Sequence, residues 1–288
     1  MKSLYKVLII LESALLLLSG CTSTSQESTP SENPLHIERI SHRDGEVLQY
    51  VDSELDLVFM TGDQGPLSRH MDLSGATSWR GMRPRAFVDA IHFYRRILTD
   101  IYPLDIIRDD LKLIVLAASN SLADTDSQNS VGSRSWASVP NSGIVMTSQP
   151  DYRSNPKAAF DLFNHEMAHI ITLTEERSRM ILTPWRTLLP DGFLYLEEAN
   201  EQKKRNPVFY DGSLRQKVEH GFVSLYAQIS YEEDLAETAA VAMGRPLAIK
   251  PSQPLQSKIE LIHQLYCKIH PGMDSAWFQA AHTYRSNL

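Results

Sequence analysis

The sequence predicts an α+β fold, in which a strand-rich N-terminal part precedes a helical C-terminal part. Short β-favouring apolar runs gather in residues 35–150, whereas apolar residues at three- and four-residue spacing dominate residues 151–288. Strands followed by helices, rather than a regular alternation of the two, are typical of the α+β class. With 288 residues and 42% apolar content, the chain is long enough for one large domain or two small ones, and we expect one domain over residues 35–288.

Residues 1–20 have the layout of a secretory signal. Basic residues near the start precede an apolar stretch over residues 7–18, which Glu12 interrupts. This stretch is too short to span a bilayer. We therefore expect residues 1–20 to direct export and to be removed.

The segment Leu18-Ser-Gly-Cys21 resembles the lipobox of bacterial lipoproteins. That resemblance implies that Cys21 is diacylated and becomes the first residue of the mature chain. Thr22 after it, rather than Asp, implies the outer membrane if the cell has one. Residues 21–34 have the composition of a flexible tether. We expect a lipid-anchored protein of the bacterial cell envelope, with an ordinary secretory signal and a chance cysteine as the alternative.

The charge and the cysteines narrow the classes of function. The formal net charge of −7 gives nucleic acid no basic surface to bind, so we expect no nucleic-acid partner. Once Cys21 is acylated, Cys267 is left without an intramolecular disulfide partner. The apolar spacing around Cys267 predicts a buried helix residue rather than a reactive thiol.

The strand-rich part contains four short runs with strand character. They are Val47–Val51, Leu55–Phe59, Leu111–Leu116 and Gly143–Thr147. A helical pattern over Arg85–Ile101 separates the second run from the third. A stretch rich in Ser, Asn, Asp and Gly, Ser119–Asn141, predicts a loop.

Two helices are expected in the second half of the chain. The first, over residues 155–173, begins with Asn155 as N-cap and Pro156 in the first helical position. Its apolar stripe contains Phe160, Phe163, Met167, Ile170 and Leu173. The second, over residues 230–243, ends at Gly244.

The first of these helices carries the motif His165-Glu166-Met-Ala-His169. Histidines four residues apart project from one helical face, about one turn apart, and can share one metal ion. Glu166 cannot easily reach the same coordination position, but it can accept a proton from a metal-bound water. Zinc with three protein ligands lowers the pKa of that water to about 7. The motif predicts zinc-dependent amide hydrolysis; two surface histidines beside an ordinary glutamate are the alternative.

This motif, Tyr226 and the later Glu233-Asp-x-Ala-Glu237 together resemble the gluzincin metallopeptidases. The likeness is to the anthrax-lethal-factor-like catalytic domain and to zinc-dependent peptidases among bacterial lipoproteins. It implies a zincin-like fold in which Glu233 is the third zinc ligand and Glu237 braces the site. It also implies that Tyr226 helps to stabilise the oxyanion.

The residues themselves leave plainer alternatives open. Ser230-x-x-Glu233 is a capping box in its own right, and Tyr226 in an apolar segment is typical of a core. Glu233 and Glu237 are a full helical turn, about 5.4 Å, apart, so only one is expected to reach the ion. We choose Glu233, and we expect Glu237 to accept the second ring N–H of His169 or His165.

Two further segments bear on the substrate. Gly143–Thr147 is predicted either to form a sheet edge that pairs with substrate backbone or to be an ordinary interior strand. Residues 176–215, which include Trp185, either cover the site or form a solvated surface insertion.

We therefore expect a membrane-tethered zinc endopeptidase that hydrolyses peptide bonds of a peptide or protein substrate outside the cytoplasm. One alternative is a zinc-binding lipoprotein with a binding or assembly role and no turnover. Glu166 argues against it, since such a protein needs no general base. The other alternative is an amidase acting on cell-wall peptides.

Overall fold

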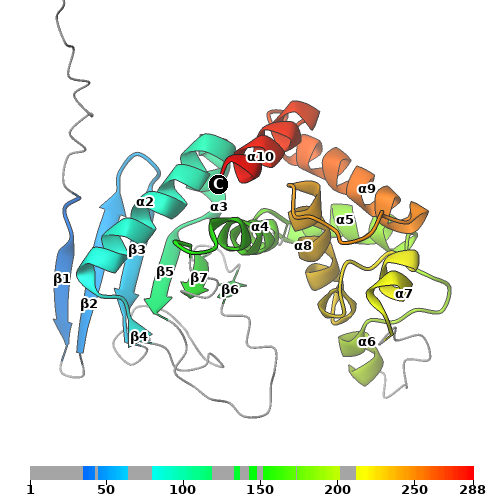
Figure 1. Ribbon diagram of the computed structural model, residues 1–288, viewed down its shortest axis with the longest axis horizontal. Helices are drawn as coiled ribbons and strands as arrows, with labels where there is room; N and C mark the ends of the chain where they lie inside the picture. The colour runs from blue at the N-terminus through cyan, green and yellow to red at the C-terminus, as the bar shows by residue number, and fades with distance from the viewer. Residues whose placement is uncertain are drawn as a thin grey trace, which may run out of the picture. The chain divides into compact units, whose positions relative to one another are not determined.

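A mixed β-sheet is built by the first half of the chain (Figure 1). The computed structural model describes residues 35–42, 45–63, 80–118, 133–136, 143–147, 152–172, 174–201 and 212–288. Its strands are β1 (Glu38–His42), β2 (Gly45–Asp52), β3 (Leu57–Gly62), β4 (Arg80–Gly81), β5 (Leu113–Ala118), β6 (Ser133–Trp136) and β7 (Gly143–Thr147). Their order across the sheet is β1-β2-β3-β5-β7-β6, with β4 paired to β5.

The sheet combines antiparallel and parallel pairs. β1, β2 and β3 form an antiparallel meander, β3, β5 and β7 run parallel, and β6 is antiparallel to β7. Parallel neighbours need a crossover connection, and between β3 and β5 this is supplied by α2 (Pro84–Ile101) and α3 (Leu104–Asp110). Figure 1 shows α2 lying across one face of the sheet, where apolar side chains of both form the main core.

The second half of the chain is helical. Its elements are α4 (Pro156–Thr172), α5 (Glu175–Arg186), α6 (Leu196–Glu201), α7 (Leu214–Glu219), the 3₁₀ turn η1 (Tyr226–Gln228), α8 (Tyr231–Ala242), α9 (Gln253–Ile269) and α10 (Ser275–Asn287). α4 packs against β6 and β7 of the sheet and against α8 (Figure 1). The architecture is the predicted α+β one, and α4 joins its two parts.

α4 begins as predicted, because the side chain of Asn155 accepts a hydrogen bond from the backbone N–H of Ala158 at 3.2 Å. The described members of its apolar stripe are all buried; they are Phe160, Phe163, Met167 and Ile170. Leu173 lies outside the described residues. The stripe therefore anchors α4 in the core and fixes which way its histidines point.

α8 is closed at both ends by capping motifs. Ser230 is the N-cap, and its hydroxyl accepts from the N–H of Glu233. At the other end Gly244 has a φ of 108°, a conformation that favours glycine. Its N–H bonds the carbonyl of Val241, and the N–H of Arg245 bonds that of Ala240, which together make a Schellman motif.

Several sequence expectations need correction. The predicted loop Ser119–Asn141 contains the strand β6, which pairs with β7; the rest of that stretch lies outside the described residues. The second predicted strand begins later, at Leu57, because residues 53–56 form a turn in which Asp56 has a φ of 52°. Of the two roles left open for Gly143–Thr147, the interior strand is confirmed, since β5 and β6 occupy both of its edges.

The expectation that Cys267 is buried is also wrong. Cys267 lies on α9 as the spacing predicted, but its side chain is exposed. The buried face of α9 carries Leu265 and Tyr266. Cys267, one residue further, lies about 100° round the helix and faces solvent.

Among the described helices, none has the length and apolarity needed to cross a membrane.

Residues 176–215 are not a solvated insertion throughout. Trp185 on α5 and Tyr195 before α6 are buried, and both contact α8 through Asp234. Residues 202–211 lie outside the described part of the chain. This segment is therefore partly a wall of the helical core.

Candidate metal centre

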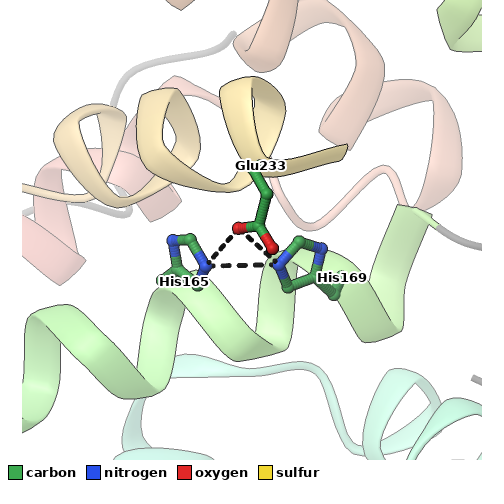
Figure 2. Close-up of side chains that lie close together, drawn as sticks. All are labelled: His165, His169 and Glu233. Carbon is green, nitrogen blue, oxygen red and sulfur yellow. Dashed lines mark hydrogen bonds and ion pairs between the residues drawn. The ribbon is translucent and has the colours of Figure 1, made fainter. Parts of the chain in front are cut away.

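Three side chains from two helices converge between α4 and α8 (Figure 2). His165 and His169 project from one face of α4 and Glu233 from the first turn of α8. Nε2 of His165 and Nε2 of His169 lie 3.2 Å apart. Oε2 of Glu233 lies 3.1 Å from Nε2 of His165 and 3.4 Å from Nε2 of His169. Both histidines are buried. The four-residue spacing on α4 thus presents both imidazoles to one carboxylate oxygen.

These three separations match those of ligands around zinc. Donors about 2.0–2.1 Å from a tetrahedral zinc ion lie about 3.3 Å from one another. In addition, Oε2 of Glu233 is buried and has no aligned hydrogen-bond donor, although two imidazole nitrogens are nearby. A buried carboxylate oxygen normally has such a donor. Two neutral imidazoles and one carboxylate are also a ligand set typical of catalytic zinc sites, so the residues fit this metal.

In the metal-free protein the same groups hold one another by charge. Burial disfavours the charged form of His165, but its contacts with Glu233 and Glu237 outweigh burial and raise its pKa to about 9. Burial likewise opposes ionisation of Glu233, yet contacts with His165 and His169 lower its pKa to about 2. The site therefore carries a charged carboxylate that a metal ion can take over from the imidazolium.

Glu237 lies behind His165 rather than beside the three converging atoms. Its Oε1 is 3.2 Å from Nδ1 of His165, within ion-pair distance although Nδ1 is not aligned for a full hydrogen bond. Arg245 donates to both carboxylate oxygens of Glu237, and the hydroxyl of Ser224 donates to Oε2 at 2.7 Å. Burial alone would raise the pKa of Glu237, but His165 and Arg245 hold it well below its ordinary value. Glu237 is thus held in place on the side of His165 that faces away from Glu233.

The sequence reasoning missed Arg245 and Ser224. Gly244 gave a usable signal for Arg245, because the Schellman motif at the end of α8 folds the next residue back along the helix. From there Arg245 also donates to the backbone carbonyl of Glu237 at 3.0 Å. Nothing in the local sequence marks Ser224 as a partner of Glu237.

Tyr226 lies at the exposed side of the site. Its hydroxyl donates to Oε1 of Glu233 at 2.9 Å, so the second oxygen of that carboxylate is left to face the histidines. Tyr226 is 44% exposed and is not a core residue. Partial burial, followed by the nearby carboxylate of Glu233, raises the pKa of Tyr226 well above its ordinary value. The phenol therefore stays protonated and can donate a hydrogen bond.

The capping box is only half formed. Ser230 caps the N–H of Glu233, but the carboxylate of Glu233 is engaged by Tyr226 and the histidines.

Glu166 is buried on α4 beside His165. Cys21 and the tether of residues 21–34 lie outside the described residues.

No family model and no curated protein matches the chain. Among solved structures, the chain is similar to a candidate zinc-binding metallo-peptidase from Bacteroides caccae. The two share 16% sequence identity and a TM-score of 0.48, over 70% of this chain and 76% of the other. A likeness of that extent is too slight to carry an argument, so the assignment of the site rests on its own geometry.

Proposed function

We propose that this protein is a zinc-dependent endopeptidase with a zincin-like catalytic domain. The observation that carries the proposal is the convergence of His165 Nε2, His169 Nε2 and Glu233 Oε2 at separations of 3.1–3.4 Å. These residues would hold the zinc ion. Glu166 follows the first histidine on the same helix, where a general base belongs, and Tyr226 supplies a donor at the exposed side.

The side chains divide the work of amide hydrolysis among them. When bound, zinc supplies a Lewis acid that acidifies a water molecule and polarises the substrate carbonyl. Glu166 accepts the proton of the attacking water and passes it to the departing amine. Tyr226 turns its single O–H away from Oε1 of Glu233 and donates a hydrogen bond to the oxygen on which negative charge develops. Glu237, held by Arg245 and Ser224, fixes the orientation of the His165 ring.

Two other functions fit part of the same site. A zinc-binding assembly lipoprotein without turnover would need the three ligands but neither Glu166 nor the protonated phenol of Tyr226. An amidase of cell-wall peptides would use the same residues on a different substrate. The presence of both catalytic groups favours an enzyme. Assays on an unfolded protein and on purified peptidoglycan then distinguish the endopeptidase from the amidase.

We further propose that Cys21 carries a lipid anchor and that residues 21–34 hold the domain off the membrane. The lipobox-like segment ending at Cys21 supports this. In a cell with two membranes the outer membrane is the expected location. Substrates would then be peptides or proteins of the cell envelope or its surroundings.

The variant Glu166→Gln tests the proposed reaction. The amide keeps the shape of the side chain but cannot accept a proton, so zinc content should be unchanged while cleavage of a fluorescent unfolded protein falls about 10²–10⁴-fold. Glu219→Gln, an exposed change on α7, is the matched control and should cleave at the parental rate. Parental activity in Glu166→Gln would contradict the mechanism, and inactivity of the zinc-loaded parent on both substrates would favour the assembly role.

A further inference from the structure

A buried ion pair lies directly behind the metal centre. Asp234 is the residue after Glu233, and its side chain and that of Lys258 on α9 are both 0% exposed. Nζ of Lys258 donates to Oδ2 of Asp234 at 2.6 Å. The same oxygen accepts from Nε1 of Trp185 at 3.1 Å and from the hydroxyl of Tyr195 at 2.8 Å. Three donors from three segments thus converge on one oxygen of α8.

Stability alone does not account for this pair. Burying two charges is costly, and apolar side chains of similar volume in place of such a pair are often neutral or stabilising. The ammonium of Lys258 lies over the rings of Phe222, at 4.2 Å from the centroid, and Trp185, at 5.4 Å, so its surroundings are largely apolar. Hydrogen bonds differ from apolar contacts in having a preferred direction. The pair therefore supplies orientation that apolar packing does not.

The orientation of α8 decides where Glu233 lies. Neighbouring residues on a helix are about 100° apart, so Glu233 faces α4 while Asp234 faces α5 and α9. A rotation of α8 by about 10° would displace a group about 5–6 Å from its axis by about 1 Å. Metal coordination distances hold within about 0.2 Å. A third ligand on a separate helix thus needs that helix locked against rotation.

We propose that Asp234 and Lys258, with Trp185 and Tyr195, are positioning residues of the metal centre. The hydrogen bonds that Lys258, Trp185 and Tyr195 donate to Asp234 fix the first turn of α8. That turn then holds Glu233 against the two histidines. This inference rests on the proposed zinc site. It assigns residues that never touch the metal a role in its affinity, and it gives segment 185–195 a function in the site.

The test measures two quantities for the full-length parent and its variants. One is the zinc affinity, by competition with a chelating dye, and the other is the melting temperature of the metal-free protein. The double variant Asp234→Leu with Lys258→Met leaves no charge unpaired and should fold. It loses the directed bonds, so zinc binding should weaken about 10–100-fold. Asp234→Asn with Lys258→Gln keeps an acceptor and a donor without charge. It should restore affinity to within a few-fold of the parent.

The matched control is Asp52→Asn. Asp52 is also buried and pairs with Arg95 at 2.6 Å, but it joins β2 to α2, away from the metal centre. Losing this pair should lower the melting temperature and leave zinc affinity unchanged. A general loss of stability is thereby separated from a loss of positioning.

Parental zinc affinity in the folded apolar double variant overturns the proposal. If that variant does not fold, Tyr195→Phe decides, since it removes one donor to Asp234 and should weaken zinc binding roughly 2- to 10-fold. Unchanged affinity in Tyr195→Phe then overturns the proposal instead. A parental protein that binds no zinc overturns the metal site itself, whereas zinc binding that none of these changes affects overturns the positioning role alone.

Discussion

Arg245 donates from Nη1 to Oε1 of Glu237 at 2.9 Å and from Nη2 to Oε2 at 3.0 Å. Such two-point contacts between a guanidinium and a carboxylate fix the plane of the carboxylate as well as its position. Because Oε1 of Glu237 also lies 3.2 Å from Nδ1 of His165, the orientation of a proposed zinc ligand depends on Arg245. Arg245, the last residue of this chain of contacts, is not on α4 or α8 but is the final residue of the Schellman motif that ends α8.

Replacing Arg245 with Met should weaken zinc binding about 10–100-fold, because Glu237 loses its anchor and His165 its fixed orientation. Arg245→Lys should fall between Met and the parent, since an ammonium cannot make the two-point contact. Zinc titration of the folded proteins measures this. Arg215→Met removes an exposed arginine on α7 and should have no effect; parental zinc affinity in Arg245→Met would show that Glu237 needs no such support.

Replacing Tyr226 with Phe should slow peptide hydrolysis about 10²–10³-fold, because a donor to the developing oxyanion is lost. Zinc affinity should change by less than about tenfold, since only one hydrogen bond to Glu233 goes with it. Steady-state kinetics and zinc titration on the same preparation measure both. Tyr231→Phe, which loses the contact of its hydroxyl with Ser178, is the control. A variant that loses zinc but keeps its turnover per bound zinc would make Tyr226 a support for Glu233 alone.

Zinc binding should release about one proton at pH 7. The pKa of His165 is raised to about 9 in the metal-free protein, so the ring is protonated there, whereas a metal ligand must be neutral. Apparent zinc affinity should rise about tenfold per pH unit up to about pH 9. Calorimetry in buffers of different ionisation enthalpy counts the protons, and a heat of binding that is the same in every buffer would contradict this.

Because of the same raised pKa, the metal-free protein becomes less stable as the pH rises, whereas zinc binding becomes stronger. An unfolded histidine has a pKa of about 6.5, so the contribution of His165 is fully present below that pH and is lost as the pH rises through about 9. The melting temperature of the metal-free protein should fall over this interval, while the increase produced by zinc should grow.

Replacing Cys21 with Ser should move the protein from the membrane fraction to the soluble fraction, because acylation needs the thiol. Cys267→Ser is the control, since it removes the other cysteine and should leave partitioning unchanged. Detergent partitioning of cell extracts measures this. Continued partitioning of Cys21→Ser into detergent would rule out the proposed anchor.

Local signals were enough to place α4 and α8. Asn155, the apolar stripe and the histidine spacing together determine where α4 begins and which face meets the metal site. The choice between Glu233 and Glu237 followed from a distance of one helical turn and from the family resemblance. Helix boundaries marked by caps and by periodic apolar residues are the features that sequence determines best.

Contacts between distant segments could not be predicted from local sequence signals. The bond between Asp234 and Lys258 joins residues that are far apart in the chain, and Lys258 lies in a helix whose pattern shows only ordinary apolar spacing. β6, with the sequence Ser-Arg-Ser-Trp, has no strand pattern of its own and exists because β7 offers it an edge. In both cases tertiary partners, rather than local preference, decide the outcome.

The zinc content of the full chain tests the central claim most directly. Metal analysis after equilibration with zinc and removal of the excess should give about one zinc ion per parental chain. His165→Ala, His169→Ala and Glu233→Ala should each lose it, Glu237→Ala should keep it with affinity lowered about 10–100-fold, and the neighbouring change Glu232→Ala should have no effect. Undiminished zinc in either histidine variant, or zinc retained by Glu233→Ala but lost by Glu237→Ala, would contradict the ligand set proposed for this protein.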